Sequence, residues 1–262
     1  MLRHISLQVL ALVAGAATAS AGVLIVGTYT GAKTPKGRTV EFRIQDGRGK
    51  ISSQPGQFIY YDHAKRTAYI VDTDKGTSFE MNEARAKQMG VQLADAQRMM
   101  EAKLKDLPPD QRAMVEKMMK EQGGGLPPPG GRTPLKFAKT GSGKVGAWPC
   151  DRYAASGDSR TVEVCTAEAP ALGISAGDVA VFEGFLDLSE KMAGEAGASR
   201  GMGSASERGF SGLPLERTES RDGKVTDRFT IETIAQETMA AADLQVPSGL
   251  KAVVPPGPPP AR

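Results

Sequence analysis

The chain has two cysteines, Cys150 and Cys165, and their spacing carries the clearest chemistry in the sequence. Their midpoint falls in Gly157-Asp158, and glycine followed by a polar residue is a favoured two-residue hairpin loop. A hairpin folded there places Tyr153 opposite Val162 and the two cysteines opposite each other. Residues directly opposite in a hairpin lie about 4.5–5.5 Å apart at Cα, a distance that a disulfide can span. The spacing therefore predicts a disulfide in a β-hairpin; the alternative is two unrelated buried thiols.

The other motifs with chemical potential are incomplete. Once an N-terminal signal is removed, His63 is the only histidine, which argues against zinc clusters and leaves one candidate for a serine-histidine-acid triad. Gly141–Gly146 matches G-x-G-x-x-G but leads into a predicted strand, whereas a dinucleotide loop opens a helix. Asp72–Gly76 begins like a calcium loop without its distal glutamate, so we expect a tight turn. We expect no catalytic residues, no metal and no cofactor, and hence no enzyme; a hydrolase is the third-ranked alternative.

Residues 1–21 have the pattern of a secretory signal peptide, with Arg3 and His4 before a short apolar run and small residues near the end. The run is too short to span a bilayer, so we expect no transmembrane segment after its removal. Export fits the even cysteine count, because disulfides persist in oxidising compartments, and we predict a periplasmic protein. With 33 basic and 30 acidic residues, the net charge of +3 gives no basic stripe for nucleic acid.

Alternating apolar residues separated by Gly and Asp turns predict a curved antiparallel sheet in the N-terminal part. The predicted strands cover residues 22–30, 37–45, 57–62, 67–72 and 77–81. A helix capped by Asn82 and running to about Lys105 follows, and Pro108-Pro109 starts a second one. This inserted pair spans residues 82–121, and a Gly/Pro linker over 122–132 ends it. Seven of the eleven methionines lie between Met81 and Met119.

Strands are predicted again from residue 133 through the cysteine hairpin. Ser175 and Asp178 form a capping pair for a third helix to about Ala196, whose wide apolar stripe should be buried. A Gly/Ser-rich loop over 194–209, a last hairpin around Asp222-Gly223, a short strand at 244–246 and a Pro-rich tail over 251–262 complete the chain. The sequence thus predicts an α+β fold in one domain, residues 22–250. Its sheet is a strongly curved, unclosed half-barrel of about ten strands, covered by about three helices.

Four segments carry a family resemblance. They are Y-Y-D-H-A-K-R-T-A-Y-I-V-D (Tyr60–Asp72) followed by T-S-F, L-P-P-D-Q-R (Leu107–Arg112), the stretch Gly146–Cys165, and V-P-S-G-L (Val246–Leu250). With these segments the chain resembles the secreted bacterial domain-of-unknown-function family 4412 over most of residues 22–250. The resemblance implies a pair of bonded cysteines and no catalytic motif. The chain departs from the family pattern at Trp148-Pro149 and in its long glycine-rich loop.

The order of elements is also similar to the periplasmic lipoprotein-carrier fold, an unclosed antiparallel barrel with helices over its apolar concave face. This similarity implies binding of an acyl chain or another apolar ligand. Methionine suits adaptable apolar surfaces, so we expect mobile methionine-rich helices to roof an apolar pocket in the bent sheet. The alternative is a structural or partner-binding envelope protein whose core is filled by its own side chains. The candidate ligand-binding residues are Phe42, Ile59, Tyr69, Met89, Leu93, Met100, Phe182, Phe185 and Phe229.

Overall fold

The computed structural model describes residues 21–31, 34–112, 114–115, 135–157, 160–195 and 209–253. The predicted signal peptide, the linker over 122–132, the rest of the second helix, most of the Gly/Ser-rich loop and the tail from residue 254 lie outside these residues. Among the described residues, 109–112 and 114–115 are helical, as predicted for the start of that second helix. The limits of the single predicted domain stay a prediction.

The first half of the sheet is a run of hairpins. Between its second and third strands, Asp46 and Gly47 both have positive φ, 52° and 75°, as a type I′ turn requires. Such turns match the twist of the strands that they join, so the local sequence is enough to set these pairings. The strands are β1 (Gly22–Gly31), β2 (Thr34–Gln45), β3 (Arg48–Gln54), β4 (Gln57–Asp62), β5 (Thr67–Asp72) and β6 (Thr77–Asn82).

The second half of the sheet consists of β7 (Ala138–Val145), β8 (Trp148–Gly157), β9 (Arg160–Ala167), β10 (Leu213–Arg221) and β11 (Lys224–Glu237). The predicted turn at Asp222-Gly223 is confirmed, with φ of 49° and 74°. Residues 244–246 were predicted as a strand, and this is wrong. The chain instead makes a 3-10 turn, η1 (Ala241–Leu244), which buries Leu244 without needing a strand partner. Lys251–Ala252, assigned by the sequence to the tail, form the short strand β12.

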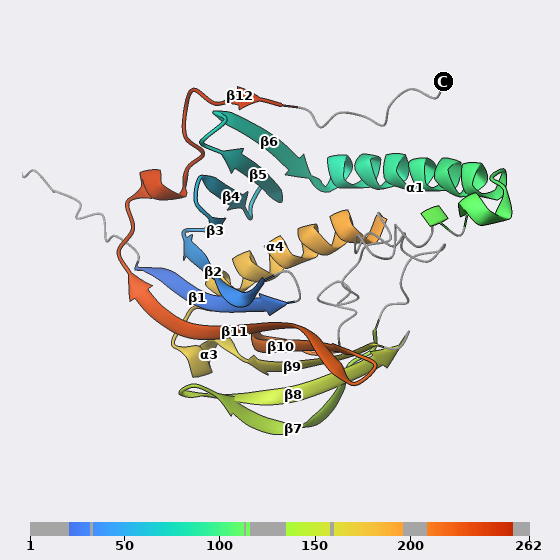
Figure 1. The fold of residues 1–262 in the computed structure, drawn as a ribbon. Coiled ribbons are helices and arrows are strands. Elements are labelled where there is room, and N and C mark those ends of the chain that lie inside the picture. Colours follow the sequence, from blue (N-terminus) through green and yellow to red (C-terminus); the bar gives the residue numbers. More distant parts are fainter. Residues whose placement is uncertain are drawn as a thin grey trace, which may run out of the picture.

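All twelve strands belong to one sheet in the order β12-β6-β5-β4-β3-β2-β1-β11-β10-β9-β8-β7. The two halves meet where β1 pairs with β11, and among the described strands only β12, beside β6, runs parallel to its neighbour. The fold is therefore α+β, with a largely antiparallel, unclosed sheet and few helices, which confirms the predicted class (Figure 1). The sheet has twelve strands, compared with the ten or so that were predicted.

The cysteine hairpin forms with a different register from the predicted one. Tyr153 lies opposite Val164, so the pairing is shifted by two residues and Gly157 ends β8. Side chains alternate along a strand, and a shift of two therefore keeps both cysteines on the same face. The cysteines become diagonal neighbours, with their Cα atoms 5.5 Å apart, and the predicted disulfide Cys150–Cys165 is confirmed. In this register Tyr153 and Val164 pack in a second small core, which favours it over the predicted one.

The helices begin at the predicted caps. The Asn82 side chain accepts a hydrogen bond from the Arg85 amide at the start of α1 (Glu83–Lys105). Ser175 and Asp178 exchange hydrogen bonds at the start of α4 (Ala176–Glu195), each side chain accepting from the other's amide. A short helix, α3 (Ala169–Leu172), was not predicted. Figure 1 shows α4 inside the curve of the sheet, whereas α1 leaves β6 and projects away from it. The helix over the concave face is thus α4, and not the methionine-rich helix.

Candidate functional site

Two parallel rows of mostly apolar residues cross the concave face of β1 to β6, one residue from each strand. They arise because alternate residues of a strand share a face and the hairpins hold directly opposite residues in register. We call the first the inner row: Val23, Ile44, Gly49, Tyr61, Ala68 and Met81. We call the second the outer row: Ile25, Phe42, Ile51, Ile59, Ile70 and Phe79.

The inner row is sealed. Its side chains are at most 3% exposed, and α4 lies close against it. Glycines make the close approach possible: a Cβ at Gly49 would lie 3.4 Å from Cγ1 of Val181. On the helix itself, a Cβ at Gly184 would lie only 2.6 Å from the Tyr61 hydroxyl and 2.9 Å from Nδ1 of His63. The contact between α4 and the sheet therefore depends on the absence of a side chain at Gly184.

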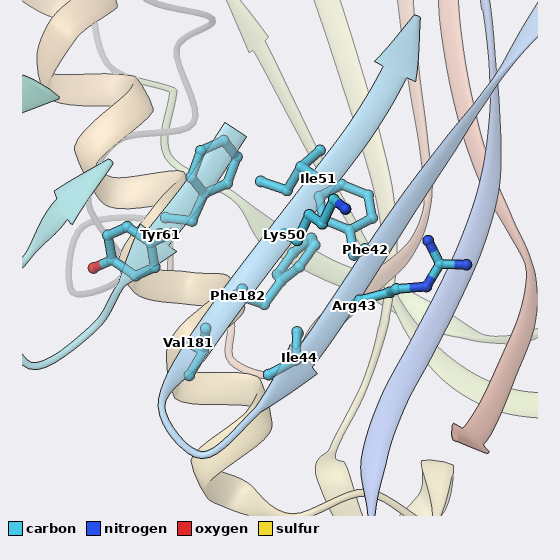
Figure 2. A pocket seen from close by; sticks show the side chains of 10 residues that line it. Phe42, Arg43, Ile44, Lys50, Ile51, Tyr61, Val181 and Phe182 are labelled. Atoms are coloured by element: carbon cyan, nitrogen blue, oxygen red, sulfur yellow. The ribbon is translucent and has the colours of Figure 1, made fainter. Parts of the chain in front are cut away.

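The outer row is covered only in part. Ile25, Phe42 and Ile51 are buried, and the Phe182 ring of α4 packs edge-on against Phe42 with 5.1 Å between centroids. Figure 2 shows this contact within the cleft along the edge of α4. Farther along, Ile59 and Phe79 are half-buried and Ile70 is 38% exposed. The outer row thus runs from beneath α4 to the surface.

The cleft does not contain the open pocket that the sequence predicted. The space between α4 and the sheet is about 10 Å³, enough for about one water molecule. Phe42, Phe182 and Phe185, three of the candidate residues, line it. Phe229 packs against Phe42, with ring centroids 6.5 Å apart, and Ile59 packs against the same core. The side chains of α4 fill the volume that we expected to be empty.

Ile59 and Phe229 pack beside the cleft without lining it, and the other four of the nine candidate residues are not placed in it. Tyr69 lies on the other face of the sheet, because it alternates with Ala68 of the inner row. Met89 and Met100 of α1 are 38% and 43% exposed, since α1 projects beyond the strands. The side chain of Leu93, also on α1, lies outside the described part of the structure.

Tyr61, Val181 and Gly184 were not among the candidate residues predicted from the sequence, although they form the contact between α4 and the sheet. The alternation of side chains along β4 places Tyr61 on the opposite face from Tyr60, and this pattern could have identified Tyr61 from the sequence. Burial raises the pKa of the Tyr61 phenol, the nearby Arg66 charge opposes this rise, and the Asp187 and Asp62 charges add to it. Tyr61 is therefore a neutral phenol in the contact with α4.

We expect Gly184→Ala to destabilise the protein by about 1–2 kcal/mol, because the new methyl group overpacks the contact with Tyr61 and His63. This loss should outweigh the gain of about 1 kcal/mol in helix propensity. Urea unfolding followed by circular dichroism measures it. Gly177→Ala in the same helix is the matched control, since its Cβ would meet only Ser175 Oγ at an ordinary 3.5 Å. The control should be neutral or stabilising; a Gly184→Ala protein as stable as the wild type would contradict the contact.

Within the described ranges, no three His, Cys, Asp or Glu side chains lie close enough to hold a metal ion. None of the described helices is both long enough and apolar enough to cross a bilayer.

No protein-family model matches the chain, so membership of family 4412 is not confirmed, and no curated protein matches it. The chain is similar in fold to PNGF-II, with a TM-score of 0.39 and 9% identity over 89% of this chain and 30% of that one. It is also similar to MucB in its complex with MucA(peri), with a TM-score of 0.39 and 11% identity over 89% and 57% of the two chains. For the Pseudomonas aeruginosa MucA/MucB complex the TM-score is 0.38 and the identity is 13%, over 90% of this chain and 59% of that one. The chain thus spans less than two thirds of each of these proteins, and the likeness concerns the fold alone.

Proposed function

We propose that this protein is an exported, non-enzymatic binding protein that sequesters a lipid-like or acylated ligand against the concave face of its sheet. The observation that carries the proposal is the outer row, a continuous line of large apolar side chains that starts beneath α4 and ends at the surface. An apolar line that continues from the core to the surface is a candidate binding site for an apolar ligand. The signal-like residues 1–21 and the disulfide support a periplasmic location.

The closed contact under α4 constrains how such a ligand would bind. A space of about 10 Å³ cannot hold an acyl chain, so the ligand lies beside α4 or displaces it. Displacement of α4 would also expose the inner row to water. Burial of the inner row beneath α4 is favourable by roughly 25 cal/mol per Å² of apolar surface, and this free energy would be lost. A ligand that binds beside α4 leaves the inner row buried and does not lose this free energy, so this is the simpler binding mode.

Native mass spectrometry of protein purified from its own periplasm tests the proposal. We expect a one-to-one adduct in the mass range of a lipid, and uptake of a fluorescent long-chain fatty acid by delipidated protein. The absence of both would refute ligand sequestration.

A second function, docking of an envelope protein, is favoured by the filled volume beneath α4. In that case the apolar core is structural, and the partner binds elsewhere. A pull-down from envelope extracts would then recover one protein in stoichiometric amounts, whether or not the bait had been delipidated. Loss of that partner on addition of fatty acid would instead point back to the ligand site.

A further inference from the structure

The uncovered part of the outer row forms a straight apolar track. Ile59 lies directly opposite Ile70, and Ile70 lies directly opposite Phe79. Neighbouring strands are about 4.8 Å apart, so these three side chains span about 10 Å at right angles to the strands. Ile51 and Phe42 continue the line beneath the edge of α4, to a total of about 19 Å. The track is therefore long and linear; Ile70 in its middle is exposed, and Ile59 and Phe79 are half-buried.

The track is also narrow. On one side lies the inner row, which α4 seals. On the other side, the next residues on the same face are Gln57, Asp72 and Thr77, which again lie directly opposite one another and are polar. Asp72 there bonds to Lys75 at 2.7 Å. An apolar strip one side chain wide suits a single unbranched hydrocarbon chain, whereas an amphipathic helix needs a wider groove.

The positively charged side chain of Arg85 lies at the β6 end of the track. The guanidinium carbon of Arg85, in the first turn of α1, is 5.7 Å from the centroid of the Phe79 ring. Its Nη1 donates to the carbonyl oxygen of Glu80 at 3.0 Å. Within the described ranges no carboxylate pairs with Arg85. An arginine keeps its charge at any working pH, and its remaining donors match the geometry of a carboxylate.

We propose that Ile59, Ile70 and Phe79 bind the hydrocarbon chain of a free long-chain fatty acid, and that Arg85 binds its carboxylate. The inference rests on the proposed function and names the ligand class for the same concave face. The acid lies along the outer row with its head group at β6, and its tail runs toward Ile51 and Phe42. Charge complementarity at one end and the width of the track together select this ligand over an uncharged lipid or a protein segment.

The test is a titration of the full chain with a polyene fatty acid whose fluorescence rises in apolar surroundings, and with its methyl ester. We expect Arg85→Gln to weaken binding of the acid about tenfold and to leave the ester unchanged, because the substitution removes a charge-assisted hydrogen bond. Arg85→Lys should restore most of the affinity for the acid. The Asn82 cap is kept in both variants, because it accepts from the backbone amide of residue 85.

Ile70→Glu should weaken binding of acid and ester alike by about tenfold or more, since it places a charge in the middle of the track. Ile70 is exposed, so the variant should fold. The matched control is Val225→Glu in β11, at a valine that is 57% exposed, and it should bind as the wild type does.

The results distinguish a wrong assignment of the binding site from a failure of the proposed function. If wild type binds the acid but Ile70→Glu and Arg85→Gln bind it equally well, the assignment of this site is wrong and sequestration elsewhere stands. Equal losses of acid and ester in Arg85→Gln would contradict the carboxylate contact. If wild type binds neither acid nor ester and also carries no lipid adduct from its own periplasm, the proposed function itself fails.

Discussion

Replacing Glu219 with alanine should lower the free energy of unfolding by about 3 kcal/mol, because it removes a carboxylate that is bonded to two arginines in a buried cluster. Glu219 is 5% exposed in β10. Its carboxylate accepts from Nη2 of Arg217 at 2.8 Å and from Nη2 of Arg221 at 3.2 Å. Arg160, opposite Arg221 on β9, also acts on it through its charge. Without the carboxylate, the positive charges of Arg217 and Arg160 would repel each other in a water-poor site, whereas Arg221 is half-exposed.

Urea unfolding followed by circular dichroism measures the effect. Glu163→Ala is the matched control: it removes the same charge from an exposed position of the neighbouring strand β9, and should change stability by at most about 0.5 kcal/mol. Glu219→Gln should fall between the two, since it keeps the shape and one acceptor. A loss below about 1 kcal/mol for Glu219→Ala would mean that the arginines relax into water, as surface pairs do.

The same cluster gives stability a pH dependence of known sign. Burial alone would raise the pKa of the Glu219 carboxyl, but the hydrogen bond and charge of Arg217, with the charges of Arg160 and the bond from Arg221, lower it below its usual value of 4.5. A carboxyl whose pKa is lowered by folding contributes stability above the pKa of the unfolded chain and loses it as the pH falls through the folded value. We therefore expect stability to fall on acidification below about pH 4.5, and to fall less steeply in Glu219→Gln.

Elements set by local sequence were predicted well. The Asp46-Gly47 and Asp222-Gly223 turns, the Asn82 cap and the Ser175–Asp178 pair each act within about four residues, and each is confirmed. These signals lie within hairpins and at helix ends, and they therefore allowed most strands and both long helices to be predicted from the sequence. Where the signal was weaker, as in the 3-10 turn that ends at Leu244, the prediction was wrong.

Features that depend on which elements meet were not predictable in the same way. An apolar stripe shows that a helix needs a partner without naming it, and so α1 was expected over the sheet in the place that α4 occupies. Alternation shows that Tyr61 and Tyr69 lie on opposite faces of their hairpin, but it does not say which face α4 covers. The outer row itself depends on the registers of five consecutive strand pairings. An error of one residue in any of them would have broken it.

Removing the disulfide with the double substitution Cys150→Ala and Cys165→Ala should lower the free energy of unfolding by about 3 kcal/mol. The bond closes a short loop, with a sequence separation of 15, and a cross-link of this length restricts the unfolded chain by roughly that amount. Both cysteines are buried in the main core, so a part of the loss comes from the missing sulfur contacts. The double variant avoids the stray thiol that a single substitution would leave.

Equilibrium unfolding in urea, with and without a reductant, measures this loss. The matched control is Ser156→Ala with Thr161→Ala in the same hairpin, where two exposed hydroxyl groups lie 3.1 Å apart; it should cost less than about 1 kcal/mol. Reductant should bring the wild type most of the way to the stability of the cysteine variant, since the reduced thiols keep their core contacts, and should leave that variant unchanged. Fatty-acid binding should survive wherever the variant is folded, because the outer row lies on β1 to β6 and the disulfide joins β8 to β9. Loss of binding by a folded cysteine variant would place the ligand near the hairpin and contradict the site on the outer row.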